Sequence, residues 1–138
     1  MSPKIKFLLL LFAFQLNFAQ ENCESKIYSI KFYVVEKTTR HNIGGPFIEI
    51  LSGNERIGFA SGDFEGFAET HICSEKIKND TITLKVFGMR SVPKTLTHKI
   101  TSDTSIIIEV DYGESPFNTV NERDQFLRIH YKFVCSTH

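Results

Sequence analysis

The sequence lacks an excess of charge of either sign. Lysine and arginine contribute 16 residues and aspartate and glutamate another 16, so the formal net charge at pH 7 is +0. Basic residues do not gather into a cluster in any segment. A protein that binds nucleic acid electrostatically needs a clustered excess of lysine and arginine to displace counterions. We therefore expect no nucleic-acid partner.

Long apolar runs are also scarce, and the clearest one lies near the first residue. An apolar run over residues 7–14 follows two lysines, and Ala19 places a small residue just before Gln20. This is the pattern of a secretory signal peptide. The run is short for a permanent helix across a hydrocarbon core, which needs about 20 residues. We predict a signal peptide over residues 1–19, export after cleavage and no transmembrane span in the mature chain. An uncleaved anchor and lipid attachment at Cys23 are the alternatives.

Cysteine is used only three times, at Cys23, Cys73 and Cys135. Thiols outside the cytosol tend to be oxidised, so three cysteines in an exported chain favour one disulfide and one remaining thiol. A metal-binding thiolate would need partners, and His71 lies on the same face as Cys73 if that segment is a strand. Two ligands are fewer than the three or four of a usual metal site. We therefore favour structural roles and expect no metal or cofactor.

Sustained helical periodicity is absent from residues 27–110. Apolar residues instead alternate with period two in short segments rich in Val, Ile, Thr, Tyr and Phe, which is typical of strands. The expected strands cover residues 30–34, 48–50, 56–60, 68–72, 82–86, 96–100 and 106–110. Short strands at roughly ten-residue spacing predict an all-β fold, an antiparallel β-sandwich. Its expected core consists of Ile30, Phe32, Val34, Ile48, Ile50, Ile82, Leu84, Val86, Ile106, Ile108 and Val110.

The end of the chain gives a more ambiguous pattern. We divide the mature sequence into a sandwich domain over residues 20–112 and a C-terminal extension over residues 113–138. In the extension, every second residue from Leu127 to Cys135 is apolar or a cysteine, and those between are mostly charged or polar. This alternation predicts an eighth strand. A short amphipathic helix over residues 120–129 is the competing interpretation.

Three turn segments carry a further pattern. Residues 43–48 read Ile-Gly-Gly-Pro-Phe-Ile, residues 62–68 read Gly-Asp-Phe-Glu-Gly-Phe-Ala after Gly58, and Gly88-Met89 follows a later strand. Together they resemble the carboxypeptidase regulatory-like domain, a transthyretin-like β-sandwich common in secreted and envelope proteins of Bacteroidetes. The resemblance extends over residues 32–110.

The matching turns suggest structural roles for Gly45, Asp63, Gly66 and Gly88. Asp63 is expected to cap its turn by accepting hydrogen bonds from nearby backbone amides, and Gly66 to reverse the chain between two strands. Gly45 belongs to the element before the second strand, and Gly88 closes a later strand.

The resemblance also implies a disulfide pairing. In a transthyretin-like sandwich the first strand runs antiparallel to the fourth, so the start of one lies beside the end of the other. Cys23 precedes the first expected strand and Cys73 ends the fourth. The resemblance therefore implies a bridge between Cys23 and Cys73, with Cys135 as the rival partner of Cys23.

Exposed aromatic residues are the candidate contacts with a partner, because an aromatic face supplies contact area at low entropic cost. Tyr33, Phe64 and Phe87 are expected at the surface. Phe64, at the tip of a turn, is the most suggestive of them, and the alternative is that it folds back over the edge of the sandwich. The acids Asp63, Glu65 and Asp111 lie at turns or strand ends, where solvated caps are more common than cation ligands.

The resemblance favours binding over catalysis. Relatives attach this domain to a zinc carboxypeptidase or place it ahead of an outer-membrane transporter barrel, but the zinc pattern His-x-x-Glu does not occur here. Transthyretin-like hydrolases end in Tyr-Arg-Gly-Ser, whereas this sequence ends in residues 134–138, Val-Cys-Ser-Thr-His. A Cys135 nucleophile would need His130 or His138 as a base. We expect a non-catalytic exported module that binds or scaffolds an envelope protein or glycan, in an oligomeric state that the sequence leaves open. The alternative is a small transthyretin-like ligand-binding protein or hydrolase.

Overall fold

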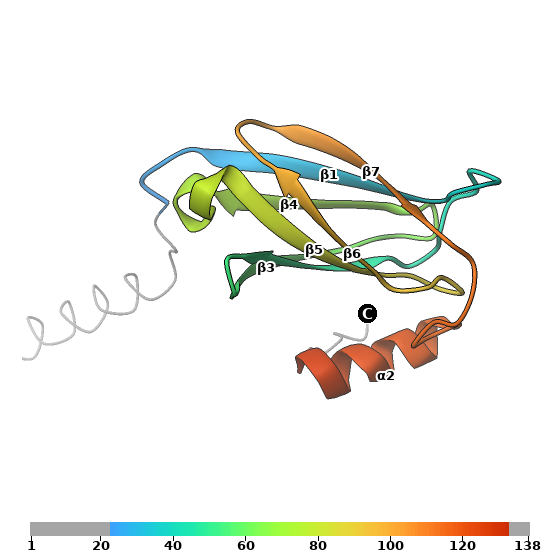
Figure 1. Cartoon of the computed structure of the whole chain (residues 1–138). Coiled ribbons are helices and arrows are strands. Elements are labelled where there is room, and N and C mark those ends of the chain that lie inside the picture. Colours follow the sequence, from blue (N-terminus) through green and yellow to red (C-terminus); the bar gives the residue numbers. More distant parts are fainter. Residues whose placement is uncertain (1–22, 133–138) are drawn as a thin grey trace, which may run out of the picture.

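Two β-sheets pack face to face, and one α-helix lies outside them (Figure 1). This arrangement comes from a computed structural model that describes residues 23–132. The predicted signal peptide and Cys135 lie outside the described residues. The fold is a mostly β sandwich, as the period-two pattern of the sequence predicts.

All seven expected strands are present. They are β1 (Ile27–Glu36), β2 (Phe47–Ser52), β3 (Glu55–Ser61), β4 (Phe67–Cys73), β5 (Thr81–Phe87), β6 (Lys94–Lys99) and β7 (Thr104–Val110). Two short 3-10 helices, η1 (Ser74–Lys76) and η2 (Lys78–Asp80), connect β4 to β5. The helix outside the sandwich is α2 (Val120–Tyr131).

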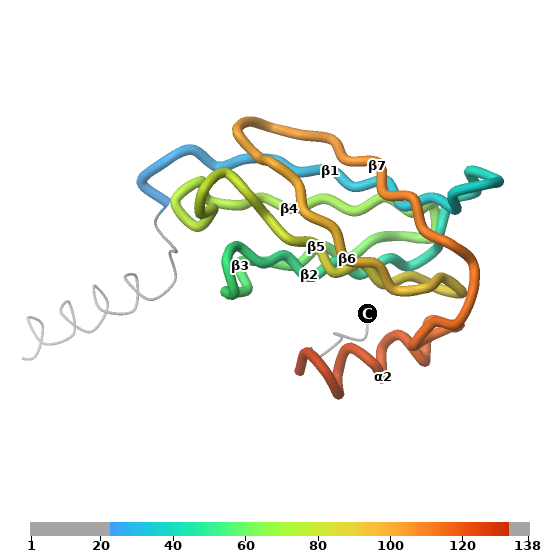
Figure 2. Tube along the Cα trace, in the orientation of Figure 1, coloured from blue at the N-terminus to red at the C-terminus, as the bar shows by residue number. Residues whose placement is uncertain are grey.

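The strand order is β4-β1-β7 in one sheet and β3-β2-β5-β6 in the other. Neighbouring strands are antiparallel except β1 and β7, which pair in parallel from Ile30 opposite Thr104 to Glu36 opposite Val110. The expectation of a purely antiparallel sandwich is therefore wrong at this pair. Each connection reverses the chain, so odd-numbered strands all run in one direction, as the tube in Figure 2 shows. Because β1 and β7 run in the same direction, their pairing is parallel.

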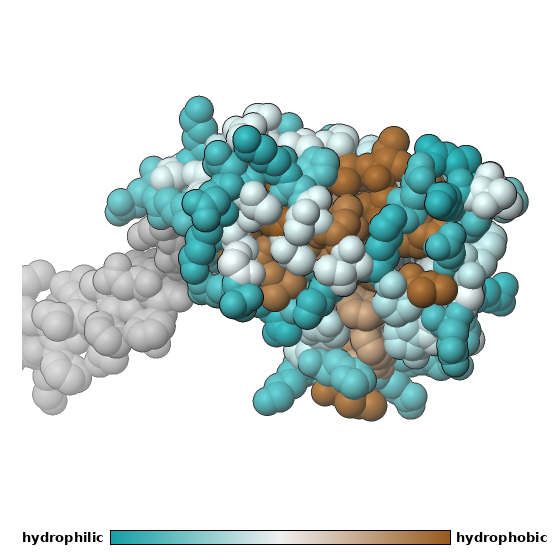
Figure 3. Space-filling view, in the orientation of Figure 1, coloured by the Kyte–Doolittle hydropathy of each residue, from teal (hydrophilic) through white to brown (hydrophobic). Residues whose placement is uncertain are grey.

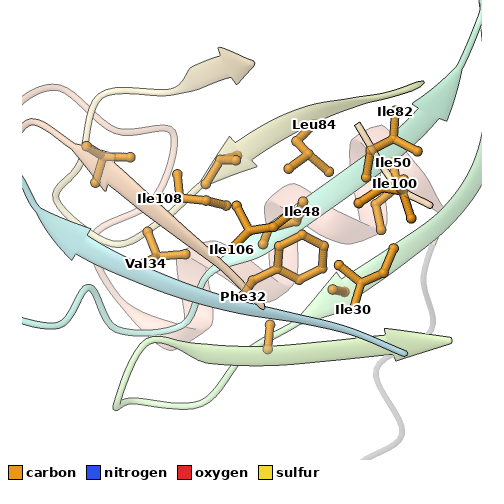
Figure 4. Packing of buried hydrophobic residues seen from close by; sticks show 14 of the residues in the cluster. Ile30, Phe32, Val34, Ile48, Ile50, Ile82, Leu84, Ile100, Ile106 and Ile108 are labelled. Carbon is orange, nitrogen blue, oxygen red and sulfur yellow. The ribbon is translucent and has the colours of Figure 1, made fainter. Parts of the chain in front are cut away.

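The hydrophobic core fills the space between the two sheets (Figure 4). Every residue of the predicted core is buried, from 0% exposed for Ile30 to 3% exposed for Ile106. Alternating side chains on the strands point inward, which buries the inner face of each sheet. On β2 the outward side chains Phe47 and Glu49 are buried as well. Further members of the same cluster are Ile43, Ala60, Ala68, Ile72 and Ile100.

A disulfide joins Cys23 and Cys73, whose Cα atoms are 5.6 Å apart. The register explains the pairing, because Ile27 at the start of β1 lies opposite Cys73 at the end of β4. This is the pair that the resemblance implies. The bridge closes a loop of 50 residues and marks one end of the sandwich, which we call the disulfide end.

The expectation of an eighth strand from Leu127 onward is wrong for the part that the structure describes, because residues 120–131 form α2. The competing interpretation, a short helix over residues 120–129, is confirmed. The Thr119 hydroxyl accepts a hydrogen bond from the Glu122 amide, and the Glu122 carboxylate accepts one from the Asn118 amide (2.7 Å). These bonds satisfy amides that a helix start leaves without partners. Leu127 is buried and Phe126 half-buried, so helical spacing places them against the sandwich. Residues 133–138 lie outside the described part of the chain.

Helix α2 covers the outer face of the four-stranded sheet (Figure 1). The Phe126 ring lies 5.3 Å from Phe87, and the Tyr131 ring 4.9 Å from Phe47, between ring centroids. The expectation that Phe87 is exposed is therefore wrong, because the helix half-buries it. The linker before the helix is anchored by the fully buried Phe117. Figure 3 shows that the outward surface of α2 mixes hydrophilic and hydrophobic side chains.

Candidate functional site

A groove of about 740 Å³ lies at the end of the sandwich opposite the disulfide. Four segments line it, at residues 42–44, 89–90, 112–113 and 118–120. The first two belong to the β1–β2 and β5–β6 loops, the third follows β7, and the fourth is the start of α2. We call this the loop-end groove. It exists only because α2 returns along the sandwich and brings its first residues beside the loops.

Backbone hydrogen bonds hold the lining segments against one another. The Met89 amide donates to the Gly44 carbonyl (3.2 Å), and the Gly113 amide donates to the Arg90 carbonyl (3.0 Å). The Ser115 hydroxyl lies 2.7 Å from the carbonyl oxygen of Gly88, which ties the linker before α2 to the β5–β6 loop. The groove is therefore built from segments whose backbone positions are fixed.

The accessible side chains of the groove are both polar and apolar, because the exposed Val120 and the half-buried Met89 belong to the lining. Tyr112 is 51% exposed, and Asn42, Arg90 and Asn118 are exposed beside it in the lining. Arg90 carries the only charge among the described lining residues. Its φ of 58° lies in the left-handed region, which costs a non-glycine residue roughly 1–2 kcal/mol. The surrounding loop thus holds Arg90 in one unusual backbone conformation.

Phe64 lies at the rim of this groove. It is 71% exposed at the tip of the β3–β4 loop, so it does not fold back over the sandwich edge. A Cβ atom built on Gly44 would lie 3.8 Å from the Phe64 ring and 2.8 Å from the Met89 side-chain methyl. The sequence-predicted contact residue is therefore a neighbour of two lining residues. That it contacts a partner stays a prediction.

The turn that carries Phe64 is organised by Asp63 and Gly66. Asp63 Oδ1 accepts hydrogen bonds from the amides of Glu65 (2.9 Å) and Phe67 (3.2 Å). Gly66 has a φ of 79°, and a Cβ there would lie 2.6 Å from the Val34 carbonyl oxygen. Only glycine fits this close approach without a shift of the backbone.

The other two predicted turn glycines lie beside the groove. Gly45 also has a positive φ, 56°, and a Cβ on it would approach the Arg123 side chain of α2 at 3.4 Å. A Cβ on Gly88 would lie 2.4 Å from the Ile43 side chain. Both glycines therefore allow close packing behind the lining segments.

A buried carboxylate anchors the far end of α2. Glu49 on β2 is 5% exposed and lies 3.4 Å from the Arg56 guanidinium. That guanidinium also lies over the rings of Phe59 (4.9 Å) and Tyr131 (5.1 Å). Burial raises the pKa of Tyr131 above its ordinary value, and a hydrogen bond to the negatively charged Glu49 raises it further, while Arg56 opposes the shift. These contacts fix the helix whose first residues complete the groove.

Histidines do not converge in the described part of the chain. His41 lies in the β1–β2 loop, and the other three lie on separate elements: His71 on β4, His98 on β6 and His130 on α2. Within residues 23–132, no three histidine, cysteine or acidic side chains are grouped so that they could hold a metal ion. None of the described helices is long and apolar enough to span a membrane. A Cys135 nucleophile would need His130 or His138 as a base, and both Cys135 and His138 fall outside the described residues.

A second exposed surface lies on the outer face of the three-stranded sheet. Tyr33, 42% exposed, pairs with Phe67 on one side and with the exposed Ile107 on the other. The Tyr33 and Phe67 ring centroids are 5.3 Å apart. This row is apolar, whereas the loop-end groove is concave and lined by both polar and apolar side chains.

Comparison with known proteins establishes the fold. No family model and no curated protein matches the sequence. A DUF3823 family protein from Parabacteroides merdae superposes with a TM-score of 0.51 at 12% identity, covering 64% of this chain. The matched part is 48% of that protein, so this chain corresponds to about half its length. BcpA, the major pilin subunit of Bacillus cereus, gives a TM-score of 0.47 at 11% identity over 64% of this chain and 31% of its own. At 12% identity, the property that this chain shares with the DUF3823 family protein is the fold.

Proposed function

We propose that this protein is an exported, non-catalytic β-sandwich module of the carboxypeptidase regulatory-like type that binds an envelope protein or glycan through its loop-end groove. The observation that carries the proposal is the groove itself. It combines a concave shape with the exposed Tyr112 ring, the Arg90 guanidinium and a fixed backbone. Binding sites are characteristically concave and largely pre-formed, with a few placed polar groups.

The chemistry of the lining supports binding rather than catalysis. The lining contains no histidine, cysteine, aspartate or glutamate among the described residues. Nucleophilic catalysis requires a nucleophile beside a base, usually with a third group that orients the base. Thr119 carries the only aliphatic hydroxyl among the described lining residues, and this hydroxyl already accepts the capping hydrogen bond of α2.

Export is supported by the signal-peptide pattern of residues 1–19 and by the disulfide between Cys23 and Cys73. Disulfides persist in oxidising compartments and are rare in the cytosol. Intact mass of the protein recovered from the cell envelope or the medium tests this part. We expect a chain that begins at Gln20, and a chain that retains Met1 would contradict it.

Two exposed tyrosines provide a matched test of the binding surface. Tyr112 lies in the groove and Tyr33 on the outer face of the three-stranded sheet, with similar exposures of 51% and 42%. Immobilised protein is used to capture material from envelope extract, alongside Tyr112→Ala and Tyr33→Ala. We expect the captured species to be lost with Tyr112→Ala and retained with Tyr33→Ala. The reverse result would assign binding to the outer sheet face and refute the groove.

A further inference from the structure

We infer that the ligand of the loop-end groove is a saccharide, an inference that rests on the proposed function. The Tyr112 ring takes the apolar face of one sugar ring, and the side chains of Asn42, Arg90 and Asn118 bind its hydroxyls. The groove residues that carry this assignment belong to four segments held together by the fold.

The size and composition of the groove favour a sugar over a protein surface. Its volume of about 740 Å³ lies within the range of small-molecule sites, roughly 300–1,000 Å³. A protein hot spot is instead centred on aromatic or aliphatic anchors that become fully desolvated. Here two carboxamides, a guanidinium and backbone groups stand beside a single aromatic ring, with the apolar side chains of Val120 and Met89 completing the lining.

The lining groups match the two kinds of surface that a sugar presents. Each hydroxyl of a sugar both donates and accepts hydrogen bonds, and a carboxamide also offers both functions. Asn42 and Asn118 bring two carboxamides to the groove, and Arg90 adds several donors. The C–H face of a pyranose ring is apolar, and it fits the face of a tyrosine whose hydroxyl stays in water.

The groove is prepared for a ligand before it binds. The Met89–Gly44 and Gly113–Arg90 backbone hydrogen bonds fix the loops, and the Thr119 cap fixes the start of α2. Sites that are already ordered lose less entropy on binding, which matters for weakly binding ligands such as sugars.

Arg90 predicts which saccharides bind best. It is the only charged residue among the described lining residues, and no lining carboxylate is present there to neutralise it. A guanidinium binds a carboxylate through two parallel hydrogen bonds. We therefore expect a uronic-acid-containing oligosaccharide to bind more tightly than a neutral one, and an amino sugar with a free ammonium group to bind most weakly.

Saturation-transfer NMR and calorimetry with the oxidised mature chain test this inference. The probes are neutral, uronic-acid-containing and free-amino oligosaccharides of defined length. Stacking on an aromatic ring contributes enough that Tyr112→Ala should weaken binding by about tenfold or more. Tyr112→Phe keeps the ring, and Tyr33→Ala leaves the groove intact, so both should bind within about twofold of the parent. Arg90→Gln should remove the preference for uronic acid and leave neutral binding in place.

The outcomes separate this inference from the proposed function. If no saccharide binds, but Tyr112-dependent capture from envelope extract returns a protein, the saccharide assignment is wrong and the binding module stands. If capture does not depend on Tyr112, the groove is not the binding surface and both fail. Saccharide binding that Tyr112→Ala leaves unchanged places the sugar elsewhere and overturns the inference. One-dimensional proton NMR of each variant establishes that it is folded.

Discussion

Replacing Tyr131 by phenylalanine removes one oxygen atom from α2 and leaves its ring in place. The Tyr131 ring centroid lies 4.9 Å from that of Phe47, 5.8 Å from that of Phe59 and 5.1 Å from the Arg56 guanidinium. Phenylalanine has the same ring and keeps all three contacts. The change therefore isolates the hydrogen bond from the Tyr131 hydroxyl to Glu49.

The magnitude follows from the environment of Glu49. A hydrogen bond to a charged group contributes about 1.5–3 kcal/mol, and a buried charge that loses a partner pays its desolvation cost. Arg56 remains at 3.4 Å, but its side chain is 45% exposed, so the compensation it provides is at most about 1 kcal/mol. We expect Tyr131→Phe to lower the free energy of unfolding by about 2 kcal/mol. Tyr112→Phe, at an exposed position, should change it by no more than about 0.5 kcal/mol.

Guanidinium unfolding of the oxidised protein at neutral pH measures both variants, and alkaline titration adds a second test. The raised pKa of Tyr131 means that the folded protein keeps this proton where an ordinary tyrosine, with a pKa of 10.0, loses it. The contribution to stability is therefore complete below pH 10 and is lost as the pH rises above it. A Tyr131→Phe variant as stable as the parent, or simultaneous ionisation of all 4 tyrosines, would refute this reasoning.

Three further predictions concern the sandwich itself. Reduction of the Cys23–Cys73 bridge, which closes 50 residues, should lower the free energy of unfolding by about 4 kcal/mol in guanidinium titrations with and without reductant, and equal midpoints would contradict the loop-closure estimate. Gly66→Ala should destabilise the protein more than Gly53→Ala, although both glycines have a positive φ. The new Cβ would lie 2.6 Å from a backbone oxygen at Gly66, but 3.6 Å from the nearest side chain at Gly53. Thermal melts compare the two, with about 1–2 kcal/mol expected for Gly53→Ala. Hydrogen bonds from the amides and hydroxyls of Thr39 and Thr38 lower the pKa of Glu36 below 4.5. The contribution of ionised Glu36 to the free energy of unfolding is therefore present above pH 4.5 and is lost as the pH falls further. Between about pH 3 and pH 7, the melting temperature of Glu36→Gln should therefore depend less on pH than that of the parent protein. Parallel curves of melting temperature against pH for the two proteins would contradict this role of Glu36.

The strands and core were predictable because their signal is local. Alternation such as Ile30, Phe32 and Val34 directly specifies one buried face of a strand. The turn at Asp63 and Gly66 is equally local, since the aspartate bonds amides within four residues of itself. The disulfide could not be predicted from a local pattern, because the pairing of β1 with β4 came from the family resemblance.

The last turns of α2, from Leu127 onward, were assigned to a strand rather than to the competing helix because their residues satisfy two periods. Leu127, Ile129 and Tyr131 alternate as in a strand, but Phe126, Leu127 and Tyr131 also lie on one side of a helix. The Thr-x-x-Glu pattern of Thr119 and Glu122, which is typical of a helix start, was the signal that distinguishes the two. The helix also explains why Glu49 is buried, although its position between two isoleucines is typical of an exposed side chain. Tyr131 of α2 covers Glu49 and donates a hydrogen bond to it.

The loop-end groove and the parallel β1–β7 pair had no local signal. Each lining segment is an ordinary turn in the sequence, and the groove arises only when the loops meet the start of α2. Tyr112 and Arg90 were therefore not recognised as candidate site residues. Phe64, predicted from its place at a turn tip, was found at the rim because the β3–β4 loop lies at the same end.

The most direct test of the groove is a map of amide chemical shifts in isotope-labelled protein titrated with the species captured from envelope extract. We predict that the shifted amides cluster at Gly44, Arg90, Tyr112 and Asn118, with Tyr33 and Ile107 unchanged. Shifts confined to the face around Tyr33 and Ile107, with the groove amides unmoved, would contradict the assignment of binding to the loop end.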